Sequence, residues 1–174
     1  NMLSGHHDES SNQLLLALAQ DSRPAIAAIA LQRLLETDPQ SIHSIDRELL
    51  KNADANVRRL TAQSLVENPS AEAVQQLADL FNDRHPGVRN YARESLEVLA
   101  KQDSLRETVL EQAQRIIAGD DWWGLEQAAR LFGTIDHEPA AERLVELLEH
   151  ERTEVFVTAG WALRELAVAA TLPA

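Results

Sequence analysis

A short apolar pattern recurs five times along the chain and restricts its fold more than any other feature. Each copy begins with an apolar residue, has a small residue four positions later and, in most copies, has leucine four positions after that. The first residues of the copies, which we call the anchors, are Ile26, Val57, Val88, Leu125 and Val155. Apolar residues spaced by four lie on one face of a helix, so each anchor marks an amphipathic helix. Recurrence of this helix at intervals of 30 to 37 residues predicts a stack of repeats.

A second apolar stripe ends shortly before each anchor helix, so every repeat is expected to be a pair of helices. The stripes end at Ala17-Leu18, Leu49-Leu50, Leu80-Phe81, Ile116-Ile117 and Leu147-Leu148. Residues typical of turns separate the two helices, and Pro24 and Pro86 suit the first turn of the helix that follows. The expected pairs, within one repeat domain of residues 12–168, span 12–37, 41–67, 71–101, 104–134 and 139–168. We expect residues 1–11 to be a polar, disordered segment and residues 169–174 to be a C-terminal tail.

Composition favours helices and excludes several kinds of function. Leucine and alanine, with 26 copies each against seven aromatic residues, fit helices better than strands. The net charge of −12 argues against nucleic acid as the partner, because phosphate binding needs clustered lysine and arginine. The absence of cysteine excludes disulfides, thiol nucleophiles and thiolate metal ligands. The apolar runs are far shorter than the roughly 20 residues that span a bilayer, so we expect no membrane insertion. The compartment stays open, with the cytoplasm favoured.

Two of the copies resemble HEAT repeats, in the short bacterial form that is also seen in phycobilin-lyase-like proteins. The matching residues are Asp83…Pro86-Gly87-Val88-Arg89…Ala92…Ser95-Leu96 and Asp54…Val57-Arg58…Thr61…Ser64-Leu65. The resemblance covers roughly residues 12–168 and implies an all-α, right-handed α-solenoid of about five HEAT-like helix pairs. A tetratricopeptide array is the main rival, but its signature aromatic and Gly-Tyr positions do not recur. In the HEAT family an aspartate and an arginine six residues later form a ladder between repeats, and here only Asp83 with Arg89 keeps that spacing.

The solenoid fold implies a function by analogy. Such arrays usually act through an extended surface, so we predict a non-catalytic protein–protein interaction scaffold that presents a groove formed by the second helices. The predicted partner is a protein or an acidic peptide, and we expect no enzyme activity and no cofactor. The alternative is a ligand-binding or catalytic HEAT-like protein, lyase-like or nucleic-acid-modifying, that uses the region near Trp122, Trp123 and Arg130.

Arginine and asparagine side chains gather one, two and five residues after the anchors. At these positions they are expected to lie beside the core and to form a basic stripe in an otherwise acidic chain, suited to bidentate binding of carboxylate or phosphate. The opposing interpretation is that they pair with neighbouring acids such as Glu94, Glu97 and Glu126. The candidate partner-binding residues of the stripe are Arg58, Arg59, Arg89, Asn90, Arg93 and Arg130.

Trp122 and Trp123 complete the list of candidate partner-binding residues. They lie together in the turn 119–124, flanked by glycines and two aspartates. Tryptophan is common at binding hot spots, which favours a contact with a ligand or partner. The other interpretation is local packing, in which the two rings close a gap where Gly133 replaces the leucine of the fourth copy.

Metal chemistry and the ends of the array complete the expectations. Deoxyhypusine hydroxylase, a HEAT-like enzyme, holds two irons with His-Glu pairs on its second helices. The dipeptides His137-Glu138 and His150-Glu151 fall outside those positions, so we predict no metal site.

The segments 14–18 and 166–170 are apolar on more than one face. Self-association, or flanking units of a longer chain, would cover them.

Overall fold

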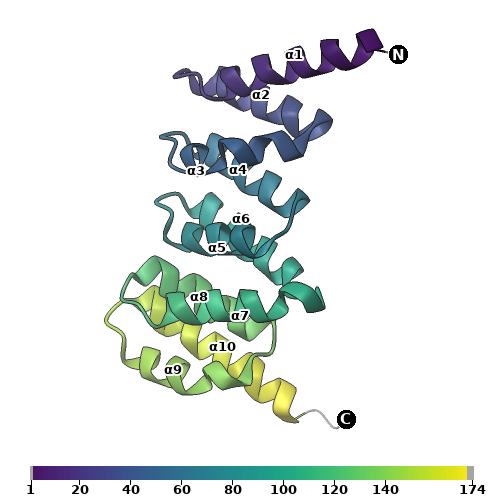
Figure 1. Ribbon diagram of the computed structural model, residues 1–174. Helices are drawn as coiled ribbons and strands as arrows, with labels where there is room; N and C mark the ends of the chain where they lie inside the picture. The colour runs from purple at the N-terminus through teal and green to yellow at the C-terminus, as the bar shows by residue number, and fades with distance from the viewer. Residues whose placement is uncertain (1, 172–174) are drawn as a thin grey trace. The chain divides into compact units, whose positions relative to one another are not determined.

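A computed structural model describes residues 2–171, and the side chains of residues 9–167, as two compact units that divide after Pro69. Within residues 2–171 the chain forms helices and no strand. The first unit, shown in purple and blue in Figure 1, contains α1 (Met2–Ala19), α2 (Pro24–Thr37), the 3-10 helix η1 (Pro39–Ser44), α3 (Asp46–Leu49) and α4 (Ala55–Glu67).

The second unit holds the remaining helices and stacks them as successive layers (Figure 1). Its elements are α5 (Ala71–Asp79), η2 (Leu80–Asn82), α6 (Pro86–Leu99), α7 (Asp103–Ile117), α8 (Trp122–Thr134), η3 (Glu138–Ala140), α9 (Ala141–Glu146), η4 (Leu147–Glu149) and α10 (Thr153–Thr171). Every anchor lies in the second helix of a pair, namely α2, α4, α6, α8 or α10. The expected succession of helix pairs is therefore present.

The first helices of the pairs are less regular than the second ones. The first helix of the second pair, expected as one continuous stripe, is divided into η1 and the four-residue α3. Pro39 starts η1, and the hydroxyl groups of Ser41 and Ser44 donate to the carbonyls of Asp38 and Ser41 at 2.9 and 2.8 Å. Side-chain hydrogen bonds of this kind compete with the helical ladder, which favours the tighter 3-10 turns.

The structure differs from the expected boundaries at both ends of the repeat domain. α1 begins at Met2, so helix runs through residues 2–11, where we expected disorder. The amide of Asn12 donates to the carboxylate of Asp38 at 3.0 Å and fixes α1 to the end of α2. Once a helix is nucleated, each added residue gains one hydrogen bond, so a helix extends readily beyond its packed part. α10 continues to Thr171, and residues 172–174 of the expected tail lie outside the described residues.

The anchor stripes form the core of both units. Four anchors are at most 1% exposed, and Ile26 is half-buried. The residues four positions later, all at most 2% exposed, are Ala30, Thr61, Ala92, Ala129 and Ala159. Thr61 satisfies its hydroxyl by donating to the carbonyl of Val57 at 2.9 Å. The small side chains at this position let the helices approach closely. The hydrogen bond of Thr61 means that the one polar side chain among them is not left unpaired in the core.

The fourth copy shows why glycine stands in the place of leucine. A Cβ atom on Gly133 would lie 2.9 Å from Ala162 Cα and 2.9 Å from Trp161 Cζ3, because α8 and α10 are in close contact there. The neighbouring Phe132 is fully buried and supplies the apolar volume. Glycine thus permits a closer approach of two second helices than any other residue would.

Candidate functional site

Burial separates the predicted arginine stripe into two groups, and the first group supports the turns. Arg58 and Arg89 are 3% and 8% exposed. Arg58 Nη1 donates to the carbonyls of Asn52 and Ala53 at 2.8 and 3.1 Å, and Arg89 Nη1 donates to the carbonyl of Asp83 at 2.7 Å. Each guanidinium thereby satisfies carbonyls of the turn before its own helix. The role of Asp83 and Arg89 between repeats stays a prediction.

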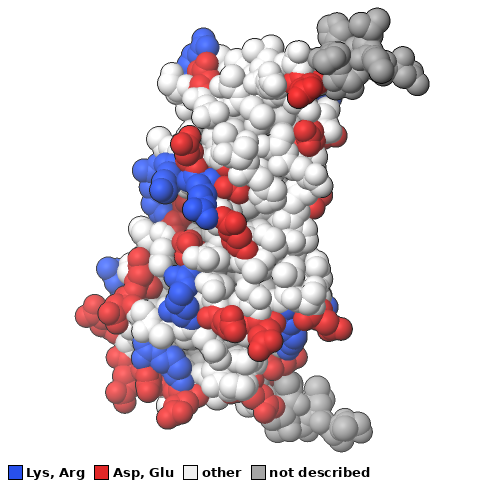
Figure 2. Space-filling model, viewed as in Figure 1, with Lys and Arg blue, Asp and Glu red and all other residues white. Residues whose placement is uncertain are grey.

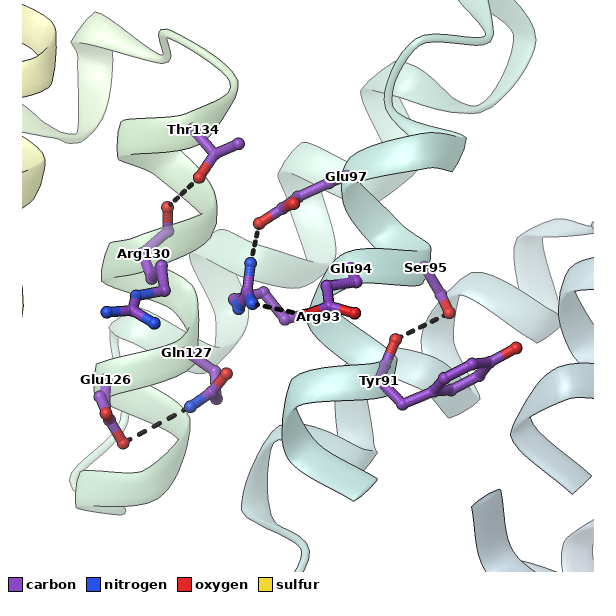
Figure 3. Close-up of polar contacts among 9 residues, drawn as sticks. All are labelled: Tyr91, Arg93, Glu94, Ser95, Glu97, Glu126, Gln127, Arg130 and Thr134. Atoms are coloured by element: carbon purple, nitrogen blue, oxygen red, sulfur yellow. Dashed lines mark hydrogen bonds and ion pairs between the residues drawn. The ribbon is translucent and has the colours of Figure 1, made fainter. Parts of the chain in front are cut away.

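Arg93 is also buried, at 8% exposure, and lies among acids of its own helix. Figure 3 shows its guanidinium between Glu97 and Glu94, with Nη1 donating to Glu97 Oε1 and Nη2 lying 3.2 Å from Glu94 Oε1. This arrangement is the pairing with neighbouring acids that we set against partner binding. A partner would contact these glutamates more readily than Arg93.

Arg59, Asn90 and Arg130 form the second group and are accessible. Asn90 and Arg130 are exposed, and Arg59 is half-buried. Arg59 Nη2 donates to Asn56 Oδ1 at 3.1 Å, and the Arg130 guanidinium carbon lies 5.7 Å from the centre of the Trp161 ring. These three side chains are therefore the members of the predicted stripe that a partner can reach most readily.

The exposed ridge of most second helices lies at position two after the anchor, which the sequence interpretation included, and at positions six and nine, which it missed. At about 100° per residue, and measured from position four at the middle of the apolar stripe, positions two, six and nine after an anchor point away from the core, whereas positions one, five and eight lie nearer to it. The exposed or half-buried residues at the outer positions of α2, α4 and α6 include Gln32, Leu35, Arg59, Gln63, Val66, Asn90, Glu94 and Glu97. In α8 the accessible positions are one, five and nine, occupied by Glu126, Arg130 and Thr134, so the first two are shifted by one residue and the third is not. The helical angle counted from the small residue at position four could have identified this ridge.

A groove lies between the second helices of the first unit. It encloses about 310 Å³ between α2 and α4. Three amides, one arginine and one glutamate meet two leucines in it, and the lining residues are Gln32, Leu35, Glu36, Asn56, Arg59, Leu60 and Gln63. Among the predicted partner-binding residues, Arg59 lines this groove.

Charge around the accessible second-helix positions of the second unit is mixed. Glu94, Glu97 and Glu126 lie on the same two helices as Arg93 and Arg130, α6 and α8 (Figure 3). Figure 2 shows the same mixture on the visible face of the second unit, where acidic side chains lie beside basic ones. The predicted basic stripe is therefore interrupted by acids in this unit.

The two neighbouring tryptophans belong to a row of four side chains. Both begin α8, where the Asp121 carboxylate accepts a hydrogen bond from the Trp123 N–H at 3.2 Å, and both are half-buried. Their ring centres are 5.4 Å apart. The Arg89 guanidinium carbon lies 4.9 Å from the Trp123 ring centre, and that of Arg152 lies 5.0 Å from the Trp122 ring centre. The row links α6, α8 and the turn before α10, which supports a packing role for both rings.

A double-mutant cycle measures how much the outer contact of this row contributes. We expect Trp122→Leu and Arg152→Ala to be coupled by about 0.5 to 1 kcal/mol in the free energy of unfolding, because an exposed cation over an aromatic ring is worth about that much. Urea denaturation of the wild type, the two single variants and the double variant gives the coupling. The control cycle pairs Trp122→Leu with Arg164→Ala, an exposed arginine of α10, and should give no coupling. Equal coupling in both cycles would contradict the assigned contact.

A second cavity lies on the side of the first helices in the second unit. It encloses about 530 Å³ and is lined by Gln114, Ile117, Ala118, Asp120, Phe132, Pro139, Ala140 and Arg143. His137 stacks on Phe132 with ring centres 5.0 Å apart, and its Nε2 lies 3.3 Å from Gln114 Nε2. Burial lowers the pKa of His137, and the positive charge of Arg106 lowers it further. The residues named for the alternative function do not line this cavity, so that alternative stays a prediction.

Two further observations concern metals and membranes. In the part of the chain that the structure describes, no three histidine, aspartate or glutamate side chains gather closely enough to hold a metal ion. Among the helices described between Met2 and Thr171, none combines the length and the apolar character that a membrane span requires.

Comparison with solved structures shows the fold. One similar chain comes from the structure of the complex of CpcE and CpcF of phycocyanin lyase from Nostoc sp. PCC7120. Its sequence is 19% identical to this chain, and the two folds superpose with a TM-score of 0.57 over 88% of this chain and 98% of the matched chain. A computationally designed armadillo repeat protein for modular peptide recognition is 17% identical, with a TM-score of 0.48, over 87% of this chain and 80% of the matched chain. The first of these likenesses confirms the predicted fold class, an all-helical α-solenoid.

Comparison with protein families gives the relationship at the level of sequence. The chain has no match among the curated proteins. The model of HEAT repeats matches residues 7–97, which is more than half of the 174 residues. The chain therefore belongs to the HEAT repeat family, as the resemblance of its second and third copies predicted.

Proposed function

We propose that the chain is a non-catalytic scaffold that binds a protein partner along its second helices. The observation that carries the proposal is the groove between α2 and α4, because it joins an accessible arginine and several amides to an apolar floor. Membership of a repeat family that stacks helix pairs supports a role in binding over extended surfaces.

The chemistry of the groove suits a polypeptide segment with an acidic residue. The amides of Gln32, Asn56 and Gln63 each offer a donor and an acceptor, which matches the alternating N–H and C=O groups of a peptide backbone. Arg59 uses one guanidinium nitrogen on Asn56 and has other N–H groups for a carboxylate. Leu35 and Leu60 supply apolar contact for a neighbouring side chain of the partner.

In the second unit the proposal uses the accessible ridge rather than the buried arginines. Asn90 and Arg130 are exposed, and each has a glutamate, Glu94 or Glu126, one helical turn away on its own helix. This surface suits a partner segment of mixed charge more than a purely acidic one, because like charges placed opposite each other are unfavourable. The exposed edges of Trp122 and Trp123 add apolar contact area.

Charge reversal in the groove tests the proposal. Peptides are first selected from a displayed random library against the wild-type chain, and their affinities are measured by biolayer interferometry. We expect Arg59→Glu to weaken the selected acidic peptides by about tenfold or more, since charged hydrogen bonds contribute about 1.5 to 3 kcal/mol. The matched control is Arg47→Glu, which makes the same charge change at an exposed residue of α3, outside the groove lining, and should leave the affinities unchanged.

Two results would contradict the proposal. The first is a library selection that enriches no peptide above background. The second is a set of peptides whose affinities fall equally with Arg59→Glu and Arg47→Glu, because that would indicate attraction by net charge alone. Circular dichroism spectra of both variants show whether the helices are retained.

A further inference from the structure

The first helix pair leaves bare a position that three other pairs bury. Three residues after the anchor, Leu60, Ala128 and Thr158 are 7%, 0% and 6% exposed, and the equivalent Tyr91 is half-buried. The residue at this position in α2 is Ile29, which is 70% exposed. Covering a large apolar side chain with that exposure would gain free energy, because burial of apolar surface is favourable.

The residue one helical turn later shows the same difference in exposure between α2 and the other second helices. Seven residues after the anchor, the buried residues are Ser64, Ser95, Phe132 and Ala162. In α2 this position is Arg33, whose side chain is 61% exposed. Positions three and seven lie one helical turn apart, so Ile29 and Arg33 form one surface, which we call the head surface.

The last pair leaves bare the opposite side of its second helix. One residue after the anchor, Ala27, Arg58 and Arg89 are 0%, 3% and 8% exposed, whereas Phe156 is 46% exposed. Eight residues after the anchor, the residues of the first three copies are buried, whereas Leu163 is half-buried. Phe156 and Leu163 lie two turns apart on one face of α10, and we call them the tail surface.

Contacts inside the second unit show that these two kinds of surface fit together. Gly133, eight residues after its anchor, packs against Trp161 and Ala162, which lie six and seven residues after the next anchor. The side of a second helix that carries position eight therefore meets the side of the following one that carries position seven. A tail surface and a head surface are the two halves of that same contact.

Charge makes the two terminal pairs compatible. Residues 12–37 carry two acids and two arginines, so they are neutral, and one of the arginines, Arg33, belongs to the head surface. Residues 139–168 carry six glutamates and three arginines, which leaves a net charge of −3. A contact between a neutral pair and an acidic pair avoids the repulsion that two acidic pairs would produce.

We propose that copies of this chain associate head to tail, with the tail surface of one copy on the head surface of the next. The occupant is a second copy because the chain itself carries both complementary surfaces and a second copy continues the contact already made between its pairs. Such a contact is heterologous, because it joins two different surfaces. A dimer therefore still has one free head surface and one free tail surface, and further copies can add to it. The head surface adjoins the groove between α2 and α4 through the ion pair of Arg33 with Glu36, but neither Ile29 nor Phe156 lines the groove, so variants at these two residues test the association separately from the proposed function.

A mixing experiment with two variants tests this arrangement. We expect the mass of the wild type, measured by sedimentation velocity and light scattering, to rise with concentration beyond that of a dimer. Ile29→Glu disrupts the head surface and Phe156→Glu disrupts the tail surface. Each variant alone should remain a monomer, because the contact needs one intact surface of each kind. An equimolar mixture still contains one intact tail and one intact head, and it should form a dimer of one copy of each variant and nothing larger.

Control variants separate head-to-tail association from nonspecific apolar attraction and from unfolding. Val98→Glu changes an apolar residue of α6 that is 54% exposed and belongs to neither surface, so its association should match the wild type. Thermal melts by circular dichroism should show that all three variants are folded. A wild type that stays monomeric at every concentration overturns the proposal, and this is the result expected if only a flanking repeat covers these surfaces. A dimer that persists in one single variant also overturns it, because that behaviour requires a contact between two like surfaces.

Discussion

Replacing Phe132 by alanine is expected to lower the free energy of unfolding by about 3 to 5 kcal/mol, the usual cost of removing a buried aromatic ring. Phe132 is fully buried, stacks on His137 and lines the cavity described in the second unit. Its neighbour Gly133 has no side chain that could move into the vacated space. The surrounding helices can therefore relax little, which favours a cost near the upper end of the range.

Urea denaturation followed by circular dichroism measures this loss. The control is Phe156→Ala at a concentration where the chain is monomeric, since Phe156 is 46% exposed and its removal should change stability by less than about 1 kcal/mol. Similar small losses in both variants would show that Phe132 does not contribute to the core as its burial indicates.

The replacement of two glycines by alanine is expected to have opposite effects on stability. At Gly133 the added Cβ would lie 2.9 Å from Ala162 Cα, so α8 and α10 must separate, and overpacking of this kind costs about 1 to 3 kcal/mol. At Gly160 the nearest atom to the added Cβ is Leu148 Cδ2 at 3.7 Å, an ordinary contact. There the better helix propensity of alanine should stabilise the chain by about 0.5 to 1 kcal/mol.

Thermal and urea unfolding of the two variants give the signs directly. Because both glycines lie in second helices of the same unit and receive the same methyl group, the comparison separates close packing from helix propensity. A Gly133→Ala variant as stable as the wild type would mean that α8 and α10 can move apart at no cost. A destabilised Gly160→Ala variant would contradict the open space seen beside that residue.

The sequence alone predicts the repeat architecture because the anchors are determined by a periodic need for burial. Val57, Val88, Leu125 and Val155 are all buried, and each lies in the second helix of its pair. Proline and capping residues also have local effects that can be read from the chain. Pro24 and Pro86 begin α2 and α6, and Asp54 and Asp121 cap α4 and α8. These features depend on neighbours in sequence, so no knowledge of tertiary packing is needed.

The candidate site was harder to predict because exposure depends on which side of a helix meets the next pair. The sequence predicts an accessible stripe of arginines one, two and five residues after the anchors, yet Arg58 and Arg89 bond to turn carbonyls while Arg59 lines a groove. A displacement of one residue turns the side chain by about 100°, which is enough to change its neighbours completely. The contacts of Trp122 and Trp123 with Arg89 and Arg152 join different repeats, so no local pattern indicates them.

The positions of the tryptophans also determine how the two units can be observed separately. All three tryptophans of the chain, Trp122, Trp123 and Trp161, belong to the second unit. Intrinsic fluorescence at tryptophan-selective excitation therefore reports the unfolding of residues 70–174 alone, whereas circular dichroism reports helix loss in both units. A difference between the two transitions would give each unit its own stability, and coincident transitions would identify one cooperative structure.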